Sequence, residues 1–284
     1  MLLKLKNTTK VWFLIFSISF FLIVAGHQSA GRDGLLWAFA ISVIVFNLLY
    51  FYSVELVSQY FKAEPIEGQD PWRVLLMTQE LARKSNIPFP DVKLIPSPAL
   101  QAFSVGRNEQ HSQIYLTTGL VETLETDELR AVIAHQVCAI QRNDSTAYAT
   151  LSTIISALLY VPHQFDRALC WSLGINFAPE KNKGRILSKV VTPVIFLLSR
   201  FVQSKASLHH LDEEAAELIG NPLSVAKAIW RIGCYTETLP YPAAPAVSSL
   251  FFVNPLAHKN WTRSFANHPS PEQRIRHLLG YYPI

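Results

Sequence analysis

Two long apolar runs near the N-terminus constrain the fold of this chain more than any other feature. Val11 to Gly26 and Leu35 to Tyr52 are almost wholly apolar, and each approaches the roughly 17–25 residues with which a helix crosses a bilayer. Between them, Gly31 to Gly34 contains two glycines, one arginine and one aspartate. The pattern predicts a transmembrane hairpin whose two ends lie on the same side of the membrane.

Composition agrees with a membrane protein. Half of the 284 residues are hydrophobic and the mean hydropathy is +0.19, which is high for a soluble domain. The net charge of +4 comes from basic residues spread thinly along the chain, so the expected partner is the lipid bilayer and no nucleic acid. Three cysteines without a C-x-x-C pair predict no disulfide framework, which fits a reducing compartment.

The flanking charges predict an orientation. Lys4, Lys6 and Lys10 precede the first apolar run, and Lys62 and Arg73 follow the second. By the positive-inside rule, the N-terminus and the part after the hairpin face the cytoplasm. A cleaved signal peptide is the alternative, but no small-x-small cleavage site follows the first run, and the second run favours an anchor.

The chain after the hairpin alternates short elements. The patterns predict an amphipathic helix over Pro71–Ser85 and strands over Val92–Ile95, Ala102–Val105 and Gln113–Thr117. A further helix begins near Thr126. Near the C-terminus, capping residues predict a helix that opens at Asn221-Pro222 and another over Pro271–Leu279. Tyr235–Ser249, rich in proline and alanine, is expected to be a loop.

The helix after Thr126 carries an altered metal-binding motif. In H-E-x-x-H, two histidines four residues apart bind zinc, and the glutamate takes a proton from the bound water. This chain has His135-Gln136-Val137-Cys138-Ala139. His135 is the one retained ligand position, Gln136 stands at the general-base position without useful basicity, and Ala139 offers no ligand atom.

The chain resembles the HtpX family of membrane-embedded zinc endopeptidases, and the resemblance covers nearly its whole length in order. It is carried by the His135 helix and by these blocks: Trp72–Ala82, Ile95–Pro98, Ala102–Asn108, Ile114–Leu120, Leu198–Arg200, Phe252–Leu256 and His268–Ile275. The resemblance implies an α-rich membrane protein with an N-terminal transmembrane hairpin and a mainly helical, zincin-like metallopeptidase domain with a small β-sheet. We expect the hairpin at 1–62 and the domain at 63–284, interrupted by a second membrane pair at 147–162 and 186–202. Hydropathy alone does not distinguish whether these two segments are buried core helices or membrane-spanning helices.

The resemblance also implies roles for residues outside the His135 helix. The third zinc ligand of the family is a glutamate four residues before an aspartate, and here Leu208 precedes Asp212 at that spacing. In the family such an aspartate orients the first histidine, and in this chain Asp212 is expected to hold His135 as a buried hydrogen-bonded pair. His268 is expected to lie near the site in a packing or hydrogen-bonding role. In the family, the strand before the zinc helix pairs with substrate, so a free edge on Gln113–Thr117 would still let peptide dock.

Two functions follow from these residues. The first is a membrane-anchored pseudopeptidase that has lost zinc and proteolysis, but binds unfolded or membrane-protein segments or regulates an active peptidase. The alternative is an active zinc metalloendopeptidase of membrane-protein quality control with rearranged ligands. Its substitute ligands would be Cys138, His209 and His210, although His209 lies one residue, or about 100° of helix, from Leu208. Both place the chain in the bacterial inner membrane with its main domain in the cytoplasm.

Overall fold

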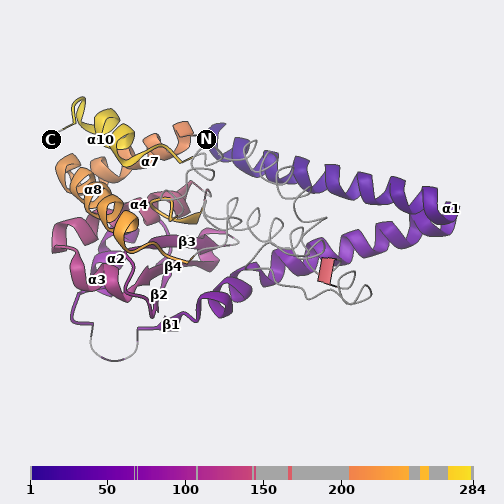
Figure 1. Cartoon of the computed structure of the whole chain (residues 1–284), viewed down its shortest axis with the longest axis horizontal. Coiled ribbons are helices and arrows are strands. Elements are labelled where there is room, and N and C mark those ends of the chain that lie inside the picture. The colour runs from indigo at the N-terminus through magenta and orange to yellow at the C-terminus, as the bar shows by residue number, and fades with distance from the viewer. Residues whose placement is uncertain are drawn as a thin grey trace.

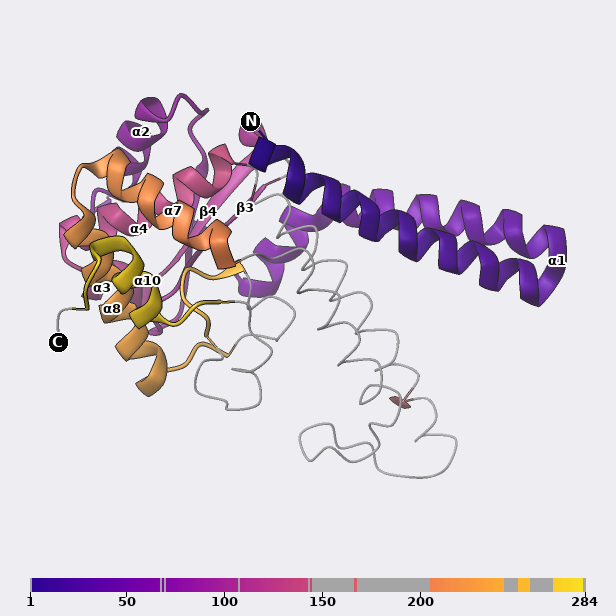
Figure 2. The ribbon, with the colours of Figure 1, turned by 90° about the horizontal axis from the view of Figure 1, so that it is seen from above.

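The N-terminal helix α1 (Leu2–Phe61) is folded back on itself at Ala30 and Gly31, where the backbone leaves helical geometry. The computed structural model describes residues 2–66, 68, 70–106, 108–142, 144, 166–167, 205–242, 250–255 and 268–282. The two arms of α1 lie side by side and extend away from the rest of the protein in both ribbon views (Figure 1, Figure 2). The predicted hairpin is therefore present. The predicted second membrane pair lies outside the described residues.

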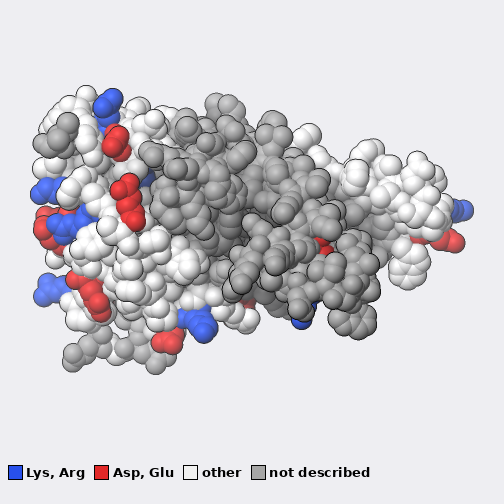
Figure 3. Space-filling view, viewed as in Figure 1, with Lys and Arg blue, Asp and Glu red and all other residues white. Residues whose placement is uncertain are grey.

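Small residues let the two arms touch near the tip of the hairpin. A Cβ atom on Gly34 would lie 2.0 Å from the carbonyl oxygen of Gly26, so a larger side chain would separate the arms. Residues Ile15–Asn47 are long and apolar enough to cross a membrane. Between Val11 and Tyr52, charge occurs only at Arg32 and Asp33, and charged atoms are seen at the far end of the hairpin in Figure 3.

A four-stranded sheet follows the hairpin. Its strands are β1 (Glu64–Pro65), β2 (Asp91–Ile95), β3 (Ala102–Gly106) and β4 (Ser112–Thr117), in the spatial order β1-β2-β4-β3. β2 and β4 are parallel, whereas the other two pairs are antiparallel. The two central strands therefore have partners on both sides.

Alternating side chains give the sheet two buried faces. Val92, Ile114 and Leu116 point into a large core that also contains residues of α2 (Val74–Lys84) and α4 (Thr126–Gln141). Phe103 and Tyr115 point to the opposite face, into a second core with the end of α1. This period of two is the geometry of a strand covered on both sides. The sheet thus lies between the membrane hairpin and the helical layer.

The remaining described helices complete the layer around α4. They are α3 (Thr118–Thr123), α7 (Lys205–Ile219), α8 (Pro222–Thr238) and α10 (Pro271–Leu279). The 3₁₀ turn η1 (Glu109–His111) lies between β3 and β4. The predicted caps are present: the Asn221 side chain accepts from Ser224 N, and Ser270 and Gln273 form a capping box. These caps fix where α8 and α10 begin.

Two boundaries differ from the sequence-based expectation. α2 begins at Val74 and not at Pro71, because Arg73 has a left-handed backbone (φ 55) and the Asp70 carboxylate accepts from Leu75 N at the helix start. Tyr235 was expected in a loop but lies in α8, which continues to Thr238. The other predicted strands and helices among the described residues agree with the structure to within one residue.

Candidate functional site

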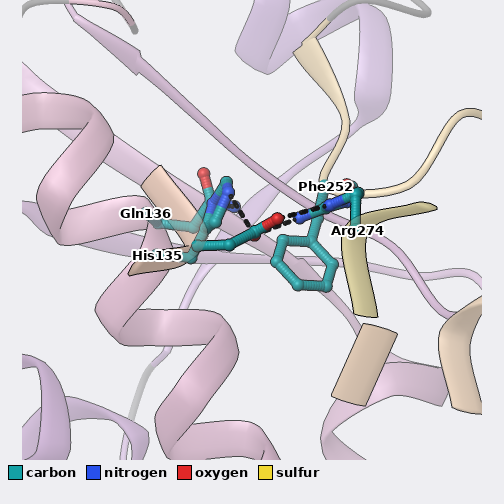
Figure 4. A network of polar contacts seen from close by, with 5 residues as sticks. His135, Gln136, Phe252 and Arg274 are labelled. Carbon is teal, nitrogen blue, oxygen red and sulfur yellow. Dashed lines mark hydrogen bonds and ion pairs between the residues drawn. The ribbon is translucent and has the colours of Figure 1, made fainter. Parts of the chain in front are cut away.

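The candidate site lies where α4, α7, α10 and the segment Leu250–Pro255 meet. His135 and Gln136 occupy the buried middle of α4 and are 3 % and 2 % exposed. Figure 4 shows them on one side of a network of polar contacts, with Phe252 and Arg274 on the other side. The rings of His135 and Phe252 pack in a T shape, with an interplanar angle of 90° and 4.7 Å between centroids. Residues far apart in the sequence are thus packed around one imidazole.

Asp212 of α7 is the charged neighbour of His135. Its Oδ1 lies 3.5 Å from His135 Nε2, a distance without hydrogen-bond geometry, since that nitrogen has no hydrogen-bond partner among the described residues. On the other side of the ring, Nδ1 lies 3.5 Å from the amide nitrogen of Gln136. The structure therefore brings Asp212 beside His135, as the sequence predicts, but as a near neighbour and not as a hydrogen-bonded pair.

Burial keeps this imidazole neutral. Desolvation lowers the pKa of His135 to about 3, and the attraction of the Asp212 carboxylate only partly opposes it. The positive charge of Arg274 lowers the pKa further, and His268 acts in the same direction. His268 thus lies within electrostatic reach of His135, which agrees with the predicted position near the site.

Arg274 is the main partner of Asp212. Its Nε donates to Asp212 Oδ2 at 2.8 Å, and its Nη2 donates to Oδ1. Nη1 donates to the Phe252 carbonyl, and the guanidinium carbon lies 4.7 Å from the centroid of the Phe252 ring. Both side chains of the ion pair are 1 % exposed. The carboxylate is therefore already saturated by a cation from the protein itself.

At the two positions where zinc ligands were predicted to be lost, the structure has apolar side chains that pack in the protein core. Ala139 is buried in the main core, and Leu208 packs against the same core from α7. Neither side chain has a nitrogen, oxygen or sulfur atom that could bind a metal. The amide of Gln136 cannot supply the carboxylate missing from the position beside His135.

The predicted substitute ligands do not converge on His135. Burial, and after it the carboxylate of Glu214, raises the pKa of Cys138 to about 12, so its thiol stays protonated, whereas metals bind the thiolate. The ring of His209 packs against that of His277, with 4.4 Å between centroids. His210 Nδ1 lies 3.1 Å from Glu213 Oε2 at the surface. Among the described residues, these three side chains and His135 do not form a group that could hold a metal ion.

The described residues therefore do not fit a zinc ion. A structural or catalytic zinc needs three or four nitrogen, oxygen or sulfur ligands at about 2.0–2.3 Å. Within the described ranges, no group of three histidine, cysteine, aspartate or glutamate side chains could hold a metal. His135 contributes one nitrogen, and the nearest carboxylate is bonded to Arg274.

Comparison with known proteins places this arrangement in a family. Residues 72–281 match peptidase family M48. The chain belongs to that family. A "Protease HtpX homolog" of Desulfatibacillum aliphaticivorans is 28% identical over 280 residues, which cover 98% of this chain and 90% of that protein. Another, from Ralstonia pickettii, is 29% identical over 297 residues, covering 98% of this chain and 99% of the relative. This M48 member is thus of the HtpX type.

A solved structure supports the fold class. The crystal structure of S. mikatae Ste24p matches with a TM-score of 0.50 and 18% identity, over 98% of this chain and 66% of that protein. At this identity the likeness speaks for the fold alone. The predicted fold class is confirmed: this M48 chain is an α-rich membrane protein with an N-terminal apolar hairpin, a small sheet and a metallopeptidase-like helical domain.

Two features of the site were missed or wrongly expected from the sequence. Arg274 and Phe252 received no individual role, although the capping box at Ser270 fixes Arg274 one turn into α10. The condition for peptide docking on Gln113–Thr117, a free strand edge, is not met, because β4 pairs with β2 on one side and β3 on the other. The edge strands of the sheet are β1 and β3, and on β3 the Ala102 carbonyl accepts a hydrogen bond from Phe252 N.

Proposed function

We propose that this M48 chain is a membrane-anchored pseudopeptidase that has lost zinc binding and proteolysis and that binds or regulates membrane-protein clients. The observation that carries the proposal is the state of the buried His135 site. One neutral imidazole remains there, and the adjacent carboxylate of Asp212 is bonded through both oxygens to Arg274. A family scaffold is kept around a centre whose residues do not fit the metal.

The chemistry of Gln136 supports the same conclusion. A carboxamide cannot accept the proton that a general base removes from an attacking water. Loss of general-base help typically slows a reaction by about 10²–10⁴-fold. Chemistry at this position would therefore be slow even if a metal reached His135.

The proposal includes a topology. We assign residues 1–62 to the membrane anchor and 63–284 to the main domain, with that domain in the cytoplasm of a bacterial cell. Lys4, Lys6 and Lys10 on one end of the hairpin and Lys62 on the other support this orientation. Clients would then be unfolded or membrane-protein segments reached from the cytoplasmic side, or an active peptidase.

The decisive experiment is the zinc content of the detergent-purified full chain, measured by elemental mass spectrometry. The matched variant is Gln136→Glu/Ala139→His/Leu208→Glu, which restores a carboxylate base and both predicted ligands. We expect less than about 0.1 zinc per wild-type chain and about one zinc in the restored variant. His135→Ala added to the restored variant is expected to remove that zinc.

The outcomes separate the parts of the proposal. About one zinc in the wild-type chain, lost in a His135→Ala variant, would overturn the pseudopeptidase and favour an enzyme with rearranged ligands. If the restored variant binds no zinc, the assignment of Ala139 and Leu208 as former ligand positions is wrong.

Client binding is tested with a defined unfolded polypeptide. Fluorescent β-casein is incubated with the wild-type chain and with the zinc-loaded restored variant. We expect saturable binding and intact casein with the wild type, and chelator-sensitive cleavage with the restored variant. Cleavage by the wild type that a chelator abolishes would contradict the proposal, and no binding at all would remove the client role.

A further inference from the structure

The side of α8 that faces away from the core carries a regular row of exposed residues. This row, the α8 stripe, has five members that follow one another at alternating intervals of four and three residues: Leu223, Lys227, Trp230, Cys234 and Glu237. Alternating intervals of four and three average 3.5 residues, which is the spacing of the seam along which two helices pack. All five residues are exposed, so the described part of the chain leaves this seam uncovered.

Trp230 is the middle residue of the α8 stripe. It is 51 % exposed, and Leu223, two turns before it, is 45 % exposed. Cys234, one turn after it, is exposed and has a free thiol. Tryptophan is strongly buried on average in folded proteins, and it is enriched among the residues that contribute most to binding at interfaces. An exposed tryptophan in the middle of a helix seam therefore indicates a protein partner.

The charges of the α8 stripe match those of a second copy of the same helix. When two copies pack antiparallel about a two-fold axis, residues at equal distances from the centre face each other. Lys227 and Glu237 have the same midpoint, position 232, as Trp230 and Cys234. Neither Lys227 nor Glu237 has an ion-pair partner within the described ranges. One register thus places each lysine against a glutamate and each tryptophan against a cysteine.

We infer that the α8 stripe is a dimer interface, in which α8 packs antiparallel on α8 of a second copy of this chain. In this register a large ring lies against a small side chain, and opposite charges face each other, so both size and charge are complementary. A parallel pair would instead place lysine on lysine and glutamate on glutamate. The interface goes beyond the proposed function and does not depend on it.

The place of α8 in the fold allows two anchored chains to meet. Both ribbon views show α8 on the domain, at the end of the molecule opposite the hairpin tip (Figure 1, Figure 2). The stripe is about 20 Å long, so the interface is smaller than the roughly 1,600 Å² of a standard complex. Anchoring in one membrane confines the two chains to the same layer and raises their effective concentration, which favours association through a small surface.

The test is energy transfer between two populations of the full chain in phospholipid vesicles, one fused at its C-terminus to a donor and the other to an acceptor fluorescent protein. We expect transfer that unlabelled wild-type chain competes away. Trp230→Ala should raise the protein-to-lipid ratio at half-maximal transfer by at least about 30-fold. Phe89→Ala is the matched control, because Phe89 is an exposed aromatic residue outside α8, and it should change that ratio by less than about threefold.

Charge reversal tests the register of the pair. Lys227→Glu places two glutamates against each other at two symmetric positions, so the half-maximal ratio should rise by at least about tenfold. The double variant Lys227→Glu/Glu237→Lys exchanges the two charges and should return to within about threefold of wild type. Lys84→Glu changes the net charge equally on the exposed surface of α2 and is expected to have no effect on transfer.

Each outcome supports or overturns the inference. Circular dichroism first establishes that the variants are folded. Wild-type transfer without competition by unlabelled chain would overturn the dimer, and the stripe would then be a surface for a different protein. Equal effects of Trp230→Ala and Phe89→Ala would move the interface away from α8. A double reversal as weak as Lys227→Glu alone would overturn the antiparallel register. The zinc content of the chain has no bearing on these results, so they are independent of the proposed function.

Discussion

Two junctions of the molecule are held together by different interactions, the one between the membrane hairpin and the β-sheet and the one between α7 and α10. On one face of the sheet, Phe61 at the end of the membrane hairpin packs against Phe103 and Phe251 in a cluster of aromatic rings. The other face of the sheet packs on α4 through the main apolar core, and beyond α4 the helices α7 and α10 are joined by the buried Asp212–Arg274 pair. One attachment is apolar, and the other is built around charge.

This difference teaches which part of the molecule can vary and which cannot. Apolar burial has no direction and scales with area, so an aromatic cluster accepts changes that keep its volume. A buried polar network is stable only when each of its groups has a hydrogen-bond or charge partner. The loss of one group leaves the others buried without a partner, which destabilises the folded state. The anchor junction should respond gradually to substitution and the charged junction abruptly.

The largest effect expected on the aromatic side comes from Phe103→Ala. The Phe103 ring is 1 % exposed and lies 4.8 Å from the Tyr115 ring and 5.0 Å from that of Phe251. Removing it should lower the free energy of unfolding by about 3–5 kcal/mol. Phe89→Ala is the control, because Phe89 is 48 % exposed. Chemical unfolding of the detergent-purified chain measures both.

A conservative change at the same position sharpens the comparison. Phe103→Leu keeps most of the volume and should cost well under half as much as Phe103→Ala. If leucine and alanine were equally costly, the aromatic junction would depend on ring geometry, and the contrast with the charged junction would disappear.

A smaller effect is expected from acid at the charged junction. The pKa of His135 falls from 6.5 in the unfolded chain to about 3 in the folded protein because of burial. The unfolded state therefore binds a proton first, so the contribution of this residue to stability is full above pH 6.5 and declines as the pH falls toward 3. At pH 4.5, two units below the unfolded value, the loss is about 2–3 kcal/mol.

The control separates His135 from the general effect of acid. His135→Gln should unfold with a weaker dependence on pH between 6.5 and 4.5 than wild type, and the substitution of the exposed His111 by glutamine is the matched control. Urea unfolding at several pH values gives, for each protein, the slope of the free energy of unfolding against pH. Parallel curves for wild type and His135→Gln would show that the imidazole is not held neutral in the folded protein.

The sequence predicted those parts of the molecule that follow from local rules. The hairpin follows from two apolar runs separated by Arg32 and Asp33, and the start of α10 follows from Ser270 and Gln273. The strands were found because apolar residues alternate or cluster between turn signals. His135 and Asp212 were expected side by side because both match positions of the HtpX motifs. In the structure, His135 Nε2 lies 3.5 Å from Asp212 Oδ1.

What the sequence did not predict depends on contacts between distant segments. Arg274 lies 62 residues from Asp212 and 22 from Phe252, so no local pattern connects them. Strand pairing was missed for the same reason: β4 lies between β2 and β3 because Gly106 to Ser112 turns the chain back while β2 joins from the other side. Nothing in the residues of β4 alone shows that both of its edges are occupied.

The smallest effect expected concerns the start of α10, which positions Arg274. Ser270 accepts from Gln273 N as the helix cap, and Ser270→Ala should lower the free energy of unfolding by about 1 kcal/mol, or the unfolding temperature by about 2–4 °C. Ser270→Asp keeps a capping oxygen and should be near wild type. A loss with Ser270→Ala above about 3 kcal/mol would mean that the capped turn, and not the guanidinium fork, aligns α10 on Asp212. The charged junction would then respond to substitution no more abruptly than the aromatic one.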